Sequence, residues 1–152
     1  MWRRDERRTE LTETSDPRPR IVVGVDGSDP SKLALRWAAR TAAAEDARID
    51  AVMVWQVPTL AYRSIGPIID MQDATENALM HAVDDVFGER RPNDMQLRAL
   101  QGGAASVILD ASRDALMVVV GSRGRGGFAG LLLGSVSAKI AEHAECPVLI
   151  VR

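Results

Sequence analysis

Five short apolar runs alternate along the chain with longer segments in which apolar residues recur every third or fourth position. Short apolar runs are typical of strands buried in a sheet, and the longer periodicity is typical of amphipathic helices. The runs predict strands at residues 20–25, 49–54, 96–100, 116–120 and 148–151. Their regular alternation with helical segments predicts parallel βαβ units with right-handed crossovers, and therefore an α/β fold.

The helical segments between these strands carry recognisable start and stop signals. The first helix begins where Ser28 or Asp29 can cap its free N–H groups. A second helical pattern covers about residues 69–91, and a third follows the glycine pair at 102–103. The last helix is expected at about residues 135–145, so that helices fill the intervals between the strands.

A glycine-rich stretch follows the fourth predicted strand. Gly121 and Gly124 are followed, after nine intervening residues, by Gly134 and Ser135, which gives the pattern G-x2-G-x9-G-[ST]. Glycine lets the backbone approach a ligand closely, and consecutive N–H groups with a helix N-terminus form a site for an anion. The spacing matches neither the P-loop G-x-x-x-x-G-K-[ST] nor a dinucleotide fingerprint after the first strand. The stretch therefore predicts a phosphate site of another kind.

Composition narrows the class of protein. The chain has 152 residues, a net charge of −2 and one cysteine, Cys146, so one domain is expected and neither nucleic-acid binding nor an internal disulfide is indicated. Residues 1–20 lack the apolar core of a signal peptide, and no later run approaches the roughly 18 apolar residues of a spanning helix. We expect a cytoplasmic protein in which residues 1–19 are a mobile tail, with a docking arm as the alternative, and residues 20–152 form the domain.

The glycine pattern resembles the nucleotide loop of the ATP-binding subgroup of the universal stress protein family. Residues 21–28 resemble the first strand and turn of that family, and residues 145–151 resemble its last strand. The resemblance covers roughly residues 20–152. It implies a Rossmann-like, adenine nucleotide alpha hydrolase-like fold: a five-stranded parallel sheet in the order 3-2-1-4-5 with helices on both faces. In that order the first and fourth strands are neighbours whose connections diverge, and a ligand is expected at their carboxyl ends.

The residues at those strand ends have the chemistry for a nucleotide. Asp26 offers a carboxylate to ribose hydroxyls, with a turn or capping aspartate as the alternative. Gly121, Gly124 and Gly134 are expected to bring backbone N–H groups to the phosphates. Arg123 can pair with a triphosphate or remain solvated.

The helix that follows the glycines adds hydroxyl groups. Ser135 and Ser137 can donate to phosphate oxygens, or serve only as helix caps. The resemblance places the base near residues 54–56, where relatives often have His-Val and this chain has Trp55-Gln56. The candidate ligand-binding residues are Val25, Asp26, Gln56, Gly121, Arg123, Gly124, Gly134, Ser135, Val136 and Ser137.

The resemblance implies an ATP-binding, ligand-dependent regulator of stress or dormancy responses, with Mg²⁺ as a possible companion of ATP. Two alternatives stay open: an enzyme such as a weak ATPase using the same crevice, and a partner module that binds cyclic AMP or no ligand. No catalytic or metal-ligating residue can be assigned, so an enzyme is less expected than a regulator. The resemblance also implies a homodimer through the apolar edge strand at residues 148–151, and an unidentified protein partner.

Overall fold

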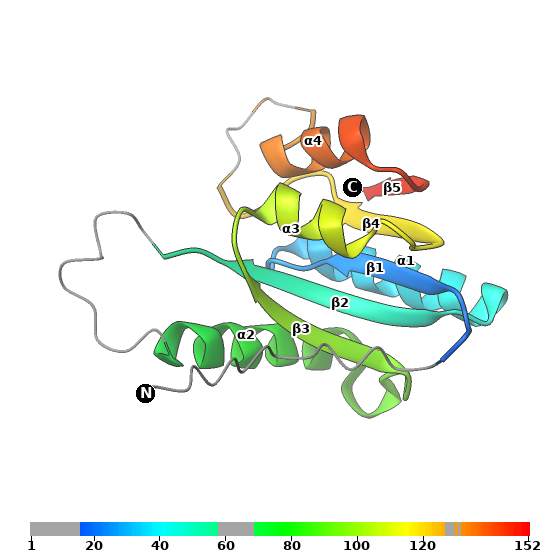
Figure 1. Ribbon diagram of the computed structural model, residues 1–152. Helices are drawn as coiled ribbons and strands as arrows, with labels where there is room; N and C mark the ends of the chain where they lie inside the picture. The colour runs from blue at the N-terminus through cyan, green and yellow to red at the C-terminus, as the bar shows by residue number, and fades with distance from the viewer. Residues whose placement is uncertain (1–15, 58–68, 127–129, 131) are drawn as a thin grey trace, which may run out of the picture.

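The computed structural model describes residues 16–57, 69–126, 130 and 132–152 (Figure 1). None of the helices in these ranges is long and apolar enough to cross a membrane. The elements, in chain order, are β1 (Arg20–Gly24), α1 (Asp29–Glu45), β2 (Arg48–Trp55), α2 (Ile69–Phe87), the 3-10 turn η2 (Gly88–Arg90), β3 (Met95–Gln101), α3 (Ala104–Ala111), β4 (Met117–Gly121), α4 (Ser135–His143) and β5 (Val148–Val151).

The five strands form one parallel sheet in the order β3-β2-β1-β4-β5, which confirms the predicted α/β class and strand order. All five predicted strands are present, with ends that differ by at most one residue. The second helical pattern divides into α2 and η2 because Gly88 adopts a φ of 52°, a left-handed conformation that ends an α-helix.

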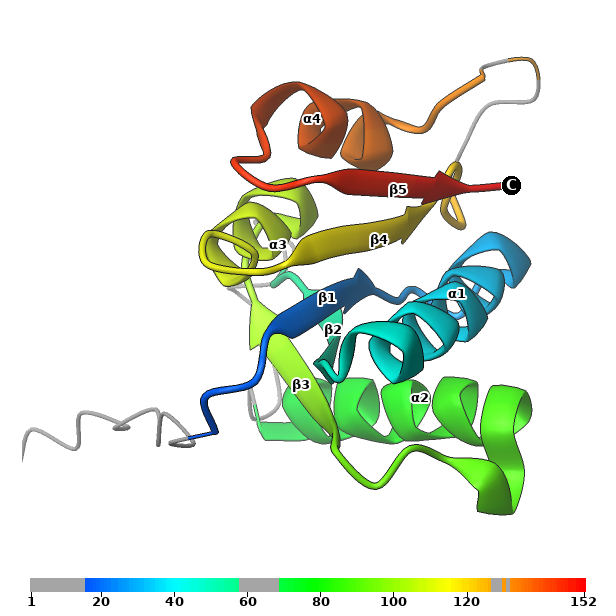
Figure 2. The same ribbon diagram turned by 90° about the vertical axis from the view of Figure 1, so that its right-hand side faces the viewer.

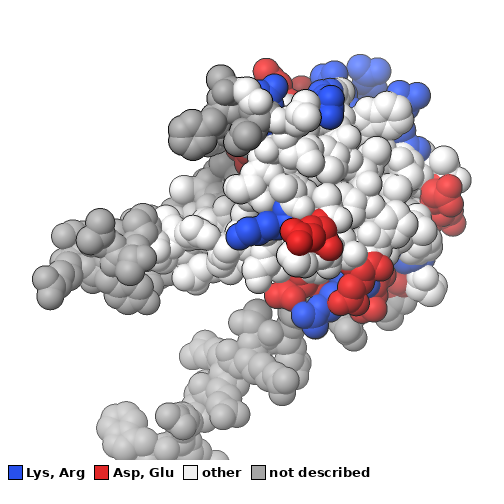
Figure 3. Space-filling model, turned by 90° about the horizontal axis from the view of Figure 1, so that it is seen from above, with Lys and Arg blue, Asp and Glu red and all other residues white. Residues whose placement is uncertain are grey.

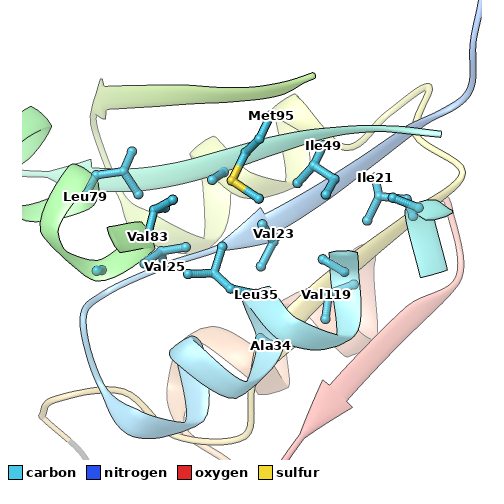
Figure 4. Close-up of a cluster of buried hydrophobic side chains, with 14 of the residues drawn as sticks. Ile21, Val23, Val25, Ala34, Leu35, Ile49, Leu79, Val83, Met95 and Val119 are labelled. Carbon is cyan, nitrogen blue, oxygen red and sulfur yellow. The ribbon is translucent and has the colours of Figure 1, made fainter. Parts of the chain in front are cut away.

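Helices cover both faces of the sheet, as expected. Figure 2 shows α1 and α2 on one side of the strands and α3 on the other. The core between the sheet and the α1–α2 layer contains Val23, Leu35, Ile49, Leu79 and Val119, all of them buried (Figure 4). A separate core lies on the opposite face.

The second core joins the sheet to α3 and α4. Val22, Val52 and Val118 of the strands pack there with Ile108 of α3 and Ile140 of α4. Successive side chains of a strand point to opposite faces, so neighbouring valines of β1 and β4 supply both cores. The near-continuous apolar runs seen in the sequence follow from this burial on both faces.

The turn from β1 into α1 is built by its own polar residues. Ser28 is the N-cap of α1, and its side chain accepts a hydrogen bond from the N–H of Ser31. Ser28 was one of the two cap residues that the sequence predicted for this helix. Pro30 lies in the first turn of the helix, where its missing N–H is not needed. This turn leaves Asp26 at the carboxyl edge of the sheet.

Ordered contacts begin before the boundary at residue 20. The Arg18 guanidinium donates to the carboxylates of Asp16 and Asp94, each at 2.7 Å, which attaches the entering chain to the start of β3. These contacts hold the pKa of Asp16 down to about 2. The other residues of the predicted tail, 1–15, lie outside the described residues, so its mobility stays a prediction.

Candidate functional site

The two motifs found in the sequence meet at one edge of the sheet. β1 ends at Gly24 and β4 ends at Gly121, and the two strands are neighbours. The connection after β1 leads to α1 on one face, whereas the connection after β4 leads to α4 on the other. A crevice opens where such connections diverge.

That crevice contains a cavity of about 470 Å³, a size that suits a small organic ligand. Nine of the ten candidate residues from the sequence line it: Val25, Asp26, Gly121, Arg123, Gly124, Gly134, Ser135, Val136 and Ser137. Gln56 does not line it. The Gln56 side chain is exposed and lies near Gly103, where an added Cβ would be 3.7 Å from its amide nitrogen.

Asp26 supplies the one carboxylate among the described residues that line the cavity. Its Oδ1 accepts hydrogen bonds from the backbone N–H of Ser28 at 2.9 Å and from the Ser28 hydroxyl. Its Oδ2 accepts from the backbone N–H of Arg125 at 3.1 Å. The carboxylate therefore already belongs to a network that spans the first and fourth strands.

The charge state of Asp26 follows from these contacts. Partial burial would raise the pKa of its carboxyl, but the hydrogen bonds from Ser28 and from the Arg125 backbone outweigh burial and lower the pKa below its ordinary value. Asp26 is therefore an anion at neutral pH. An anionic acceptor suits hydroxyl donors such as those of a ribose.

Two glycines of the motif are required by close contacts. A Cβ at Gly121 would lie 2.8 Å from the backbone carbon of Pro30, so this glycine lets the start of α1 pack against the end of β4. A Cβ at Gly124 would overlap Oδ2 of Asp26. Gly134 is less crowded, since its nearest neighbour would be 3.5 Å away, and it serves as the N-cap of α4.

The two serines of α4 differ in environment. Ser137 is buried, and its hydroxyl lies within hydrogen-bonding distance of the carbonyl oxygens of Ser122 at 2.8 Å and Gly134 at 3.0 Å. Its single hydrogen is thus directed to the protein backbone. Ser135 is exposed and lines the cavity. Neither serine is the N-cap, because Gly134 occupies that position.

The cavity lining combines polar and aliphatic groups. Arg123 and Arg125 are exposed and belong to the lining, next in sequence to its glycines. Val52 and Val54 of β2 and Ile108 of α3 are among its aliphatic side chains. A lining of both kinds fits a ligand with an apolar part and an anionic part.

Several lining residues were missed in the sequence, among them residues of two helices. Ala104 and Ile108 reach the cavity from α3, which begins after the glycine pair at 102–103. Ser31, a buried residue of α1, also lines it. The turn after β3 was visible in the sequence. Because the carboxyl ends of parallel strands share one edge of the sheet, this turn was the signal that α3 begins beside the cavity.

The described lining offers binding groups of few kinds. It contains one carboxylate, two guanidinium groups, three serine hydroxyls and the backbone of several glycines. Within the described ranges, no group of three or more His, Cys, Asp or Glu residues could hold a metal ion. The arrangement can bind an anion and hydroxyl donors.

An open parallel sheet with a ligand-sized cavity at its switch point defines the doubly wound α/β class. Within this class, the chain belongs to the universal stress protein family, whose family model matches residues 17–152. A universal stress protein of Mycolicibacterium smegmatis is 36% identical over 138 residues, which are 90% of this chain and 47% of that protein. The chain spans about half the length of the curated relatives that it matches.

Solved structures show the same fold. The universal stress protein UspA from Lactobacillus plantarum has a TM-score of 0.73 at 21% identity, covering 88% of this chain and 97% of that one. A universal stress protein in complex with cAMP has a TM-score of 0.69 at 26% identity, covering 90% and 99%. The family expected from the sequence is thus confirmed, whereas the ATP-binding subgroup stays a prediction.

Proposed function

We propose that this protein binds ATP in the crevice between β1 and β4 and acts as a ligand-dependent regulator of stress or dormancy responses. The observation that carries the proposal is the meeting of Asp26 and the glycine motif around one cavity of about 470 Å³. A chance glycine loop would not be expected to face a carboxylate held at the end of the neighbouring strand.

In this proposal each end of the cavity takes a different part of the nucleotide. The base packs between the aliphatic side chains of Val52, Val54 and Ile108, and the ribose lies beside Asp26. The phosphates lie over the glycine backbone and the N-terminus of α4, whose N–H groups and dipole favour negative charge. Arg123 pairs with the outer phosphates.

Mg²⁺ would accompany ATP through the phosphate oxygens and water. Asp26 is the one carboxylate among the described residues that line the cavity, and both its oxygens already accept hydrogen bonds. Mg²⁺ keeps several waters when it binds with nucleotides, so it does not need a cage of protein ligands.

Two other functions compete with this one. The similarity to a universal stress protein in complex with cAMP favours cyclic AMP as a second candidate ligand. An enzyme, at most a slow ATPase, would need a residue that activates water. We assign no such residue, and for this reason we propose a regulator with an adenine nucleotide as its ligand.

The first experiment is native mass spectrometry on protein purified without added nucleotide, followed by calorimetric titration with ATP, ADP and cyclic AMP. We expect ATP to bind most tightly. Gly134→Glu places a carboxylate among the N–H groups and should abolish ATP binding, whereas Gly134→Ala makes only ordinary contacts and is the matched control. Equal ATP affinity of Gly134→Glu and wild type would disprove the site.

We further propose a cytoplasmic homodimer that pairs through β5, with a protein partner that reads the occupied state. β5 is the outer strand of the described sheet and is wholly apolar in sequence. In Figure 1, α4 and β5 lie at the top of the molecule. Figure 3 shows the molecule from that side, with scattered charged side chains and a broad uncharged area between them. An apolar edge strand of this kind favours pairing with a second chain.

A further inference from the structure

The Asp26 carboxylate joins two parts of the chain that are far apart in sequence. Oδ1 accepts from Ser28, two residues further on, in the β1–α1 turn. Oδ2 accepts from the N–H of Arg125, which lies 99 residues away, just after β4. One side chain thus connects the turn after β1 to the first half of the glycine motif, residues 121–126.

The hydroxyl of Ser31 in α1 helps to fix the orientation of this carboxylate. The N–H of Asp26 donates to the hydroxyl of Ser31 at 3.3 Å, and the same hydroxyl donates to the carbonyl of Ser28 at 2.9 Å. Ser31 is buried and belongs to α1. With Oδ1 held by Ser28, Oδ2 faces the 121–126 segment in a fixed direction.

The 121–126 segment is shaped to receive that oxygen. Gly124 lies so close to Oδ2 that a Cβ would overlap it. The bond from residue 125 uses the backbone N–H, while the Arg125 guanidinium lies beside Gly27, where a Cβ would be 2.8 Å from Nη2. The connection therefore depends on the backbone at position 125 and not on its side chain.

We infer that Asp26 is a positioning residue for the phosphate-binding segment, in addition to any contact that it makes with ribose. This inference rests on the proposed function. A backbone N–H site binds an anion well only when its donors are already oriented, because ordering them on binding weakens affinity. A charge-assisted hydrogen bond to Asp26 orders the segment before the ligand arrives.

Three variants separate positioning from direct contact. Arg125→Pro removes the N–H that donates to Oδ2, and Arg125→Ala removes the guanidinium but keeps the N–H. The comparison of these two isolates the hydrogen bond from the side chain. Asp26→Asn keeps the shape of the carboxylate and replaces one of its two acceptor oxygens with an NH2 group, which can donate but cannot accept.

The readout is the affinity for ATP compared with that for adenosine, which has the same base and ribose but no phosphates. Relative to Arg125→Ala, Arg125→Pro should weaken ATP binding about 10- to 100-fold, the loss expected for one charge-assisted hydrogen bond, and leave adenosine within about twofold. Asp26→Asn should weaken ATP more than adenosine. Equal losses for the two ligands in Asp26→Asn would overturn the inference.

A ligand-free measurement keeps this inference distinct from the proposed function. Amide hydrogen exchange at residue 125 should be slow in the wild-type protein and at least about tenfold faster in Asp26→Asn. If the wild-type amide exchanges as fast as an unstructured chain, the positioning role is disproved. If it is protected but ATP does not bind, the proposed function fails, whereas the ordering of the 121–126 segment by Asp26 stands.

Discussion

Residue by residue, the glycines of the cavity have different surroundings. Gly124 faces Oδ2 of Asp26 so closely that no side chain fits between them. A Cβ built on Gly126, two residues further on, would have no close contact with the other described residues, its chain neighbours aside. The two positions therefore form a matched pair in which the same substitution has different consequences.

We predict that Gly124→Ala pushes the 121–126 segment away from Asp26 and weakens ATP binding at least about tenfold, roughly the worth of one hydrogen bond to a charged group. Gly126→Ala adds a methyl group to the same segment without the close contact to Asp26, so it should weaken ATP binding less than Gly124→Ala does. Titration calorimetry with ATP measures both. Unchanged affinity in Gly124→Ala would mean that the close approach to Asp26 has no part in binding.

The lowered pKa of Asp26 also predicts how the free energy of unfolding depends on pH. Its pKa in the folded protein lies below the ordinary value of 3.8, so the folded state favours the ionised carboxyl. This contribution is fully present above the ordinary value and is lost as the pH falls through the lower, folded pKa.

Asp26→Asn removes that titration. The difference in free energy of unfolding between wild type and Asp26→Asn should be constant near neutral pH and shrink as the pH is lowered below about 4. Urea denaturation at a series of pH values measures it. A difference that grows on acidification would contradict the lowered pKa.

Among the strands and helices, Asp50 of β2 forms ion pairs that are longer but more buried than the surface pair of Asp110 and Arg113. Its carboxylate is almost fully buried, and Oδ2 lies 3.5 Å from the guanidinium groups of Arg20 in β1 and Arg98 in β3. Asp110 and Arg113 are closer, at 2.9 Å, but both side chains are about two-thirds exposed. Water therefore screens the Asp110–Arg113 pair strongly and the pairs of Asp50 much less.

We therefore predict that Asp50→Asn lowers the free energy of unfolding by about 2 kcal/mol, because two partly buried guanidinium groups lose their anion. Asp110→Asn is the control, with an expected change within about 1 kcal/mol. Chemical denaturation of the two variants gives both values. A larger loss in Asp110→Asn would show that distance outweighs burial here.

Across the whole molecule, the outer side of β5 determines how two copies could pair. The carbonyls of Pro147 and Val151 accept from β4. Backbone groups alternate in direction along a strand, so those of Val148 and Ile150 point away from the described sheet. The N–H of Ile150 is thus placed to bond a second chain.

Ile150→Pro removes this N–H and leaves the β4–β5 ladder intact, whereas Ile150→Ala makes a similar loss of packing and keeps the N–H. If the proposed dimer pairs along β5, Ile150→Pro should be a monomer and Ile150→Ala a dimer. Light scattering at micromolar concentration measures the mass of each. A wild-type monomer under these conditions would refute the dimer.

Much of the fold could be predicted because its signals are local. Apolar runs, the Ser28 cap and the glycine spacing each depend on neighbours in sequence, and they located the strands, the start of α1 and the glycine motif. Periodicity contains no information on strand order, which came from the family resemblance. The exact end of α2 required the left-handed conformation of Gly88.

The amino-acid sequence by itself determined the α/β class, the family and nine of the ten candidate residues that line the cavity. Only the tertiary structure decided which groups face one another. It brought Ile108 of α3 into the cavity, placed Gln56 outside it, and directed the Ser137 hydroxyl to backbone carbonyls. It also joined Asp26 to the backbone of residue 125. Such contacts depend on the packing of segments far apart in sequence, and a local pattern cannot specify them.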